Sequence, residues 1–268
     1  MVYQSYYTKL ALNPLRNLLA HPLTRDLALD DPKTTVLRKK ILNQKAFLRR
    51  IYKDWYCYIL EKLPESHELV LELGSGPGFL KENLQDVISS EVFWEPEVDI
   101  VLDGLNLPFS PFSLSAILMT DVLHHIGDPR RFFNEAARCI PPFGRIIMVE
   151  PWVSPWSSLV YTYLHHEPFN PDAATWEFQQ TGPISGANIA LPWMIFQRDK
   201  TVFEEEFPQW HIEEILPMMP FVYLLSGGVS LRSLMPGWTY SFWRWIERRF
   251  DKSIDKMAMF ALIVLQKR

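Results

Sequence analysis

The first 65 residues alternate apolar and charged side chains with the period of a helix. From Thr35 to Ile59, apolar side chains recur at steps of three to seven residues and fall on one face of a long helix. Basic side chains occupy the other face: Lys39, Lys40, Arg49, Arg50 and Lys53. A charged face opposite an apolar one is typical of a solvated helix surface, so residues 1–65 are predicted to form an N-terminal helical cap.

The pattern changes at Glu68, where short apolar runs begin to alternate with helical stretches. This alternation is the signature of β/α units around a parallel sheet. Pro129 stands at the start of one such helix, where its missing N–H costs nothing. The predicted strands are 69–73, 87–93, 98–102, 114–120 and 145–149, and the predicted helices between them are 79–86 and 129–140.

Beyond Glu150 the alternation loosens, and proline and aromatic residues become frequent. A helix is predicted at 157–165, followed by two late strands at 211–216 and 257–265. We therefore predict one integrated α/β domain with a Rossmann-like, mostly parallel sheet and helices on both of its faces. The core would cover residues 66–150, and residues 151–268 would add the remaining strands with C-terminal lid insertions.

Composition narrows the class of protein. The chain has 268 residues, which one hydrophobic core can still support. Hydrophobic residues make up 48% and charged residues 22%, a balance that excludes disorder and collagen-like repeats. The net charge of −4 means that any nucleic-acid surface would have to be local.

Cysteine usage and hydropathy bear on the compartment. Cys57 and Cys139 are too few for a disulfide framework or a structural zinc site, which fits a reducing, cytosolic setting. The N-terminus has no basic-then-apolar signal pattern, and no uncharged apolar run approaches the roughly 18 residues of a membrane span. A cytoplasmic location is expected.

A glycine-rich loop follows the first predicted strand, as Gly74-Ser75-Gly76-Pro77-Gly78. A dinucleotide fingerprint, Gly-x-Gly-x-x-Gly, needs a third glycine where Phe79 stands, and Pro77 removes an N–H from any phosphate cradle. Glu72 would repel a phosphate but suits a cation. The loop therefore favours a phosphate-free nucleoside with positive charge, and an empty tight turn is the alternative.

The segment Glu72 to Gly78 reads acid-x-Gly-x-Gly-x-Gly, which resembles the first motif of class I S-adenosylmethionine-dependent methyltransferases, in particular the type 11 or UbiE-like small-molecule branch. The resemblance covers roughly residues 65–150 and implies S-adenosyl-L-methionine as cofactor. It implies that Glu91, 19 residues after Glu72, accepts hydrogen bonds from both ribose hydroxyls, with Glu95 as the second choice. The loop residues that would bind the cofactor are Glu72, Gly74, Ser75, Gly76 and Gly78.

Three further segments extend the resemblance. Asp103-Gly104-Leu105 opens a stretch like the family's Asp-x-x-x-Leu-Pro-Phe, whose Asp contacts the adenine amino group. Asp121-Val122 resembles the end of the fourth strand, under the methionine part of the cofactor, and Glu150-Pro151 matches the end of the fifth. Two turns depart from the family pattern, Ser113-Leu114-Ser115 and Pro142-Phe143-Gly144.

Two clusters of histidines are candidates for chemistry. His124 looks like the histidine of the Leu-His-Asp-Trp segment in small-molecule O-methyltransferases, and it is the candidate general base. A capping or cofactor-contacting role for His124 is the alternative. His165-His166-Glu167 could suggest a metal pair, but adjacent side chains on a helix diverge. No metal site is predicted, and pocket lining is favoured for these residues.

Aromatic side chains crowd the second half of the chain and suit a flat or lipidic substrate, or simply fill a lid core. We predict methyl transfer to a small-molecule acceptor, aromatic or lipid-like, with no nucleic-acid partner. Peripheral membrane contact through 238–250 is a less favoured alternative. The aromatic residues in question are Trp152, Trp156, Tyr161, Tyr163, Trp193, Phe221, Tyr223, Trp238, Tyr240, Phe242 and Trp243.

Three other functions fit the sequence less well than methyl transfer does. A non-catalytic cofactor-binding or regulatory protein with the same fold stays open, because intact cofactor motifs do not by themselves require turnover. A nicotinamide-dependent reductase is disfavoured, since its Tyr-x-x-x-Lys pair would have to be Tyr58 and Lys62, upstream of the glycine loop. A nucleic-acid methyltransferase is disfavoured by the charge and by Asp121-Val122-Leu123-His124 in place of an Asn/Asp-Pro-Pro-Tyr/Phe motif.

Overall fold

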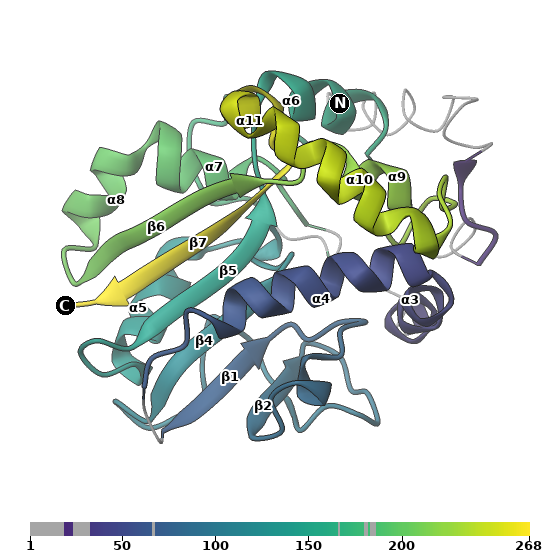
Figure 1. The fold of residues 1–268 in the computed structure, drawn as a ribbon. Helices are drawn as coiled ribbons and strands as arrows, with labels where there is room; N and C mark the ends of the chain where they lie inside the picture. Colours follow the sequence, from purple (N-terminus) through teal and green to yellow (C-terminus); the bar gives the residue numbers. More distant parts are fainter. Residues whose placement is uncertain (1–18, 24–32, 66–67, 166, 180–181, 183–185) are drawn as a thin grey trace.

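The structure is a computed structural model that describes residues 19–23, 33–65, 68–165, 167–179, 182 and 186–268. One seven-stranded sheet runs through the molecule in the order β3-β2-β1-β4-β5-β7-β6 (Figure 1). The strands are β1 Leu69–Leu73, β2 Val87–Glu91, β3 Ile100–Val101, β4 Leu114–Thr120, β5 Arg145–Pro151, β6 Trp210–Met218 and β7 Phe260–Lys267. The pairs among β1 to β5 are parallel, whereas β7 is antiparallel to both β5 and β6. The predicted Rossmann-like, mostly parallel sheet is confirmed.

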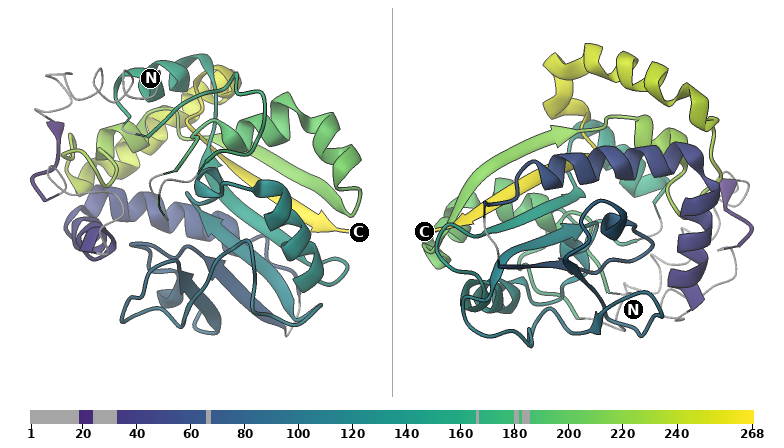
Figure 2. Two further views of the ribbon diagram at one scale, coloured as in Figure 1. Left: turned by 180° about the vertical axis from the view of Figure 1, so that it is seen from behind. Right: turned by 60° about the horizontal axis from the view of Figure 1, so that its bottom comes forward.

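Both faces of the sheet are covered, and alternation along each central strand explains why (Figure 2). In β4, Ile117 and Met119 join the core beneath helix α5, Pro129–Cys139, whereas Ala116 and Leu118 join the core beneath helix α4, Ala46–Leu60. Because two hydrophobic layers enclose the sheet, β4 is apolar over nearly its whole length and almost entirely buried.

The predicted N-terminal helix is two helices. α3, Lys33–Gln44, and α4 are separated at Lys45, whose backbone leaves the helical region (φ −94°, ψ 84°), and Figure 2 shows α3 turning steeply away from α4. The Lys45 ammonium is buried and donates to the backbone carbonyls of Ser226, Gly228 and Leu231. These contacts with a distant loop stabilise the break between the two helices. The apolar periodicity continues through Lys45, so the sequence pattern could not reveal the break. The rest of the predicted helical cap lies outside the described residues.

The predicted helix 79–86 is wrong in length, because only a 3-10 turn forms at Leu80–Glu82. α4 already covers this part of the sheet: the Tyr56 hydroxyl accepts from the Phe79 N–H at 3.1 Å, and the Arg49 guanidinium lies over the Phe79 ring. Since the space above β1 and β2 is filled from the N-terminal side, the connection needs no helix of its own.

Helix α5 forms where the sequence predicts it. Asp128 precedes Pro129 and accepts from the Arg131 N–H at 3.0 Å, so an N-cap and an N1 proline open the helix together. The predicted strand 98–102 is shorter in the structure, where it is β3. The predicted helix 157–165 corresponds to α6, Pro155–Tyr163, which begins with a capping box at Ser154.

The region after β5 contains more helix than the sequence predicted. Leu191–Trp193 (α7) and the π-helical turn Met194–Arg198 (η3) are followed, after a break at Asp199, by Lys200–Glu206 (α8). Pro192 in the first turn disguises this helical region in the sequence. Short helices follow β6, and no helix of the described part of the chain is both long and apolar enough to cross a bilayer. The helices and turns after β6 are α9 Val222–Ser226, η4 Gly237–Thr239, α10 Tyr240–Glu247, η5 Arg248–Ser253 and α11 Ile254–Met257. A further 3-10 turn, η2 Leu123–His125, follows β4.

Candidate functional site

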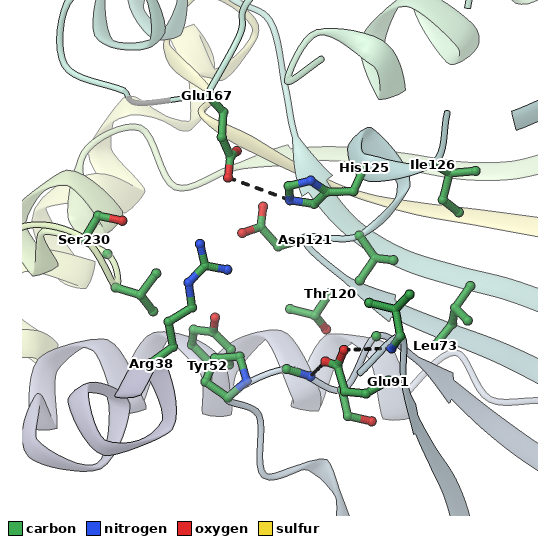
Figure 3. A pocket seen from close by; sticks show the side chains of 18 of the residues that line it. Arg38, Tyr52, Leu73, Glu91, Thr120, Asp121, His125, Ile126, Glu167 and Ser230 are labelled. Atoms are coloured by element: carbon green, nitrogen blue, oxygen red, sulfur yellow. Dashed lines mark hydrogen bonds and ion pairs between the residues drawn. The ribbon is translucent and has the colours of Figure 1, made fainter. Parts of the chain in front are cut away.

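A cavity of about 240 Å³ lies at the carboxyl ends of β1, β2 and β4 (Figure 3). From β1 the sheet continues through β2 in one direction and through β4 in the other, so the cavity lies where the strand order reverses. Open α/β sheets bind ligands at such a switch point, because the loops on the two sides diverge there. Nine of the predicted cofactor residues line the cavity: Gly74, Ser75, Gly76, Glu91, Asp103, Gly104, Leu105, Asp121 and Val122.

The loop after β1 is shaped by backbone that only glycine adopts without strain. Gly74 has φ +66°, and a Cβ there would lie 2.8 Å from a methyl group of Val122. A Cβ on Gly78 would lie 2.4 Å from the Tyr56 hydroxyl, and Gly78 does not line the cavity. Gly74 therefore lets the β1 loop approach the loop after β4, whereas Gly78 makes room for α4.

Glu91 is the carboxylate that faces the glycine loop. It ends β2, is buried, and accepts from the backbone N–H groups of Gly76 and of Val92, the latter at 3.1 Å (Figure 3). Burial raises the pKa of Glu91 against the effect of these two donors. Glu95, the second choice, is also buried but does not line the cavity.

The remaining acids of the cofactor motifs divide into two groups. Asp103 is exposed at the cavity rim and accepts from the Leu105 N–H at 2.9 Å. Glu72 is fully enclosed behind the glycine loop and does not line the cavity. Burial raises the pKa of Glu72 to about 7, with a hydrogen bond to Ser75 opposing the rise. Glu72 therefore does not touch a ligand in the cavity, and its carboxylate can act on such a ligand only through its charge, from behind the glycine loop.

His124, the predicted general base, lies behind the wall formed by the loop after β4. It is 1% exposed and is not among the lining residues, whereas its neighbour His125 is. Its Nδ1 lies 2.9 Å from a Glu150 carboxylate oxygen, and its Nε2 lies 3.4 Å from a Glu167 carboxylate oxygen. Burial disfavours the imidazolium, but the hydrogen bond to Glu150 and the nearby carboxylates of Glu167 and Asp121 outweigh burial and raise the pKa of His124 well above its ordinary value.

Glu150 organises this part of the wall. Its other oxygen accepts from the N–H groups of Val122 and Leu123, at 2.8 and 2.7 Å, so the end of β5 fixes the loop after β4. Asp121 precedes that loop in left-handed backbone, with φ +65°, a conformation that costs a non-glycine residue free energy. Burial raises the pKa of Asp121 to about 6, while the charge of His124 opposes the rise.

The far wall comes from segments that no motif marked. Arg38 of α3, Tyr52 and Tyr56 of α4, and the loop 227–231 after α9 face the strand ends (Figure 3). Among the described residues that line the cavity, Arg38 is the only arginine or lysine. Sequence reasoning missed Arg38 and the two tyrosines, because residues 1–65 were predicted only as a helical cap and carry none of the recognised motifs.

Most of the aromatic residues predicted for the substrate wall lie elsewhere. Of the eleven, only Tyr223 lines the cavity among the described residues. Trp152 and Tyr161 are buried in the core, and Trp238 and Phe242 lie on the surface, 81% and 56% exposed. The second half of the chain thus uses its aromatic side chains mainly for packing. His166 lies outside the described residues, whereas His165 and Glu167 line the cavity as expected.

Comparison with known proteins identifies the core. Residues 71–148 match the family described as methyltransferase domain. Over these residues the chain is similar to a methyltransferase domain, which agrees with the predicted resemblance.

Whole-chain similarity is more distant. A geranyl diphosphate C-methyltransferase from Streptomyces coelicolor A3(2), solved with Mg²⁺, geranyl diphosphate and S-adenosyl-L-homocysteine, is 14% identical, with 98% of each chain covered and a TM-score of 0.50. A geranyl diphosphate methyltransferase in complex with SAM is 15% identical, with 90% of this chain and 94% of that chain covered and a TM-score of 0.50. These similarities show the shared fold.

One curated relative also matches. An uncharacterized 37.1 kDa protein in a transposon of Streptomyces fradiae is 30% identical over 134 residues, which are 42% of this chain. The match spans 37% of the length of that relative.

Proposed function

We propose that this protein binds S-adenosylmethionine in the cavity and transfers its methyl group to a small-molecule acceptor. The observation that carries the proposal is the placement of Glu91 opposite Gly76 at the strand ends, in a cavity with four carboxylates. Each Glu91 oxygen accepts one backbone N–H and keeps lone-pair capacity for a ribose hydroxyl. A phosphate-free, cationic nucleoside fits this wall, whereas a pyrophosphate would face repulsion. The carboxylates are Glu91, Asp103, Asp121 and Glu167.

Each wall of the cavity has a separate task in this proposal. Glu91 would hold the ribose and Asp103 the adenine amino group, while Asp121 and Val122 lie beneath the methionine part. The sulfonium supplies an activated methyl when bound, so the chain mainly has to align the acceptor and exclude water. Alignment of two reactants can contribute about 7–11 kcal/mol toward lowering a barrier.

An aromatic or lipid-like acceptor fits the far wall. Tyr52 and Tyr223 present rings there, Leu224 and Val229 add apolar surface, and Arg38 supplies one cation. A ring or chain would bury its apolar surface against these side chains, and an anionic or hydroxyl group could meet the guanidinium. We propose that His125, which lines the cavity, contacts the acceptor directly. His124, which does not line the cavity, would influence the acceptor only through Glu167, which lies near both histidines.

Calorimetry with S-adenosylmethionine tests the cofactor site. Glu91→Ala is expected to weaken binding by about 1–3 kcal/mol, or roughly 5- to 150-fold, the scale of a lost hydrogen bond to a charged group. Glu95→Ala, which removes a buried carboxylate outside the cavity, is the matched control and should bind as the wild type does. Equal losses in both variants would contradict the assignment of Glu91.

Incubation of cell extracts with isotopically labelled cofactor, followed by mass spectrometry, tests turnover. A small molecule that gains the label supports methyl transfer and identifies the acceptor. Cofactor binding without any labelled product would instead favour the non-catalytic cofactor-binding protein.

A further inference from the structure

The wall between β4 and the segment after α6 brings together two imidazoles and a carboxylate. His124, His125 and Glu167 each offer one ligand atom, and these atoms lie within 4.8 Å of one another. The sequence predicted no metal site, and the divergence of adjacent side chains on a helix argued there against a different set, His165-His166-Glu167. In the structure His124 and His125 end a 3-10 turn, and Glu167 comes from 42 residues further along the chain to meet both.

We propose that His124, His125 and Glu167 bind a divalent transition-metal ion, such as Zn²⁺, with an open coordination position toward the cavity. Two histidines and one glutamate are a set that holds catalytic zinc in other enzymes, with water or substrate as the fourth ligand. The binding of the ion does not depend on the proposed methyl transfer.

Distances in the cluster suit an ion better than a direct bridge. The His124 Nε2 lies 3.4 Å from one Glu167 oxygen, and the His125 Nε2 lies 3.7 Å from the other. A charge-assisted N–H···O bond is shorter, about 2.7–2.9 Å. Ligands about 2.0–2.2 Å from a tetrahedral zinc lie about 3.3–3.6 Å apart, so the observed separations need little adjustment.

The surroundings of His124 match those of a metal ligand. Its Nδ1 meets Glu150 at 2.9 Å, and Glu150 is itself held by two backbone N–H groups. A carboxylate on the far nitrogen of an imidazole fixes the tautomer and aims the other nitrogen at the metal. His165 also lies near Glu167, but its Nδ1 accepts the Glu167 N–H at 3.3 Å and is thereby occupied.

The charges also leave room for a dication. Asp121, Glu150 and Glu167 place three carboxylates around the two imidazoles, with the closest Asp121 oxygen 4.0 Å from the His124 Nδ1. Arg38, across the cavity, supplies one positive charge. Metal binding requires both imidazoles to be neutral, so His124 must release any proton that it carries, and the balance is then −2, which one divalent ion neutralises.

The open position would lie where Asp121, His125 and Glu167 face the cavity. An acceptor hydroxyl bound there would lose its proton more readily, because a metal ion stabilises the oxyanion. This role, unlike the binding, rests on the proposed function.

Zinc titration of the untagged full-length protein, after removal of metals with a chelator, tests the proposal. Calorimetry and elemental analysis should give one Zn²⁺ per chain. His125→Ala and Glu167→Gln should each weaken binding at least 100-fold, and Glu150→Gln by about 10- to 100-fold, as for an outer-shell partner. His211→Ala removes an exposed histidine of β6 and should leave the affinity unchanged.

Two outcomes would overturn the site: substoichiometric zinc in the wild type, or equal affinity in the wild type and His125→Ala. If a variant does not fold, imidazole ¹⁵N resonances of the wild type decide, because zinc should shift those of His124 and His125 and spare that of His211. S-adenosylmethionine binding is measured in parallel, so that zinc binding without cofactor binding would refute the proposed function and keep the metal site.

Discussion

The two walls of the cavity are built in different ways. The strand-end wall, from the glycine loop to Val122, consists of short stretches that directly follow β1, β2, β3 and β4. The opposite wall combines α3, α4 and the loop 227–231, which lie almost 200 residues apart in the chain. The first wall needs only local turns on a sheet, whereas the second exists only once distant helices have packed.

The comparison explains where family resemblance ends. The matched residues, 71–148, cover the strand-end wall and stop before the loop 227–231. In the proposed function, a cofactor common to many enzymes would meet the locally encoded wall, and an acceptor specific to one enzyme would meet the assembled wall. Four substitutions sharpen or break this contrast, from the largest expected effect to the smallest.

Trp55→Ala should destabilise the assembled wall most. Trp55 is 1% exposed, packs on Tyr223 and Phe260, and donates its indole N–H to the Met219 sulfur at 3.2 Å. Loss of a buried tryptophan costs about 3–5 kcal/mol of unfolding free energy, measurable by urea denaturation. Trp245→Ala, at an indole that is 53% exposed, should change stability by less than about 0.5 kcal/mol.

Lys45→Met tests how the loop 226–231 is held. The substitution keeps much of the side-chain volume but leaves the carbonyls of Ser226, Gly228 and Leu231 without the ammonium donor, at a cost of about 1–3 kcal/mol. Amide hydrogen exchange should increase in residues 226–231 and not in 74–78. The exposed Lys40→Met serves as control. Increased stability would show that burying the charge of Lys45 costs more than its three bonds return.

Glu72→Gln tests the strand-end wall through pH. Burial raises the pKa of Glu72 from 4.5 to about 7, so between these values the folded chain binds more protons than the unfolded one. Stability from this group is therefore present below pH 4.5 and is lost as the pH rises through 7. Glu72→Gln should be more stable than the wild type at pH 8 by about 1–3 kcal/mol, with little difference at pH 4.5.

Several ionisable groups surround Glu72 and could also contribute to a pH-dependent difference. Glu91 raises the pKa of Glu72 and Lys81 lowers it, while Tyr52 and Tyr56 stay neutral because burial raises their pKa values. The exposed Glu65→Gln should show no pH-dependent gain. A gain in Glu72→Gln that is the same at pH 4.5 and pH 8 would indicate altered packing rather than a buried charge.

Asp128→Ala should have the smallest effect. Asp128 caps α5 through the Arg131 N–H, and loss of such a cap costs about 1 kcal/mol. Thermal unfolding followed by circular dichroism measures the loss. Because the cap is local, combining Asp128→Ala with Lys45→Met should give additive effects, whereas coupling above about 0.5 kcal/mol would show that the start of α5 and the loop held by Lys45 are coupled.

The sequence by itself determined the parts whose signals are local. The buried strand 69–73, the glycine loop, Glu91 at the end of β2, and Pro129 after its Asp128 cap all depend on a few adjacent residues. Backbone sterics, strand burial and capping act over such distances, so their patterns survive in a linear reading.

Only the tertiary structure decided which side chains meet. It replaced the predicted helix 79–86 with a single turn because α4 already filled that space, and it broke the N-terminal helix at Lys45, where carbonyls 181 to 186 residues away receive the ammonium. It enclosed His124, turned His125 toward the cavity and brought Glu167 to both. Contacts across such separations depend on packing and burial of the whole chain, which no local pattern encodes.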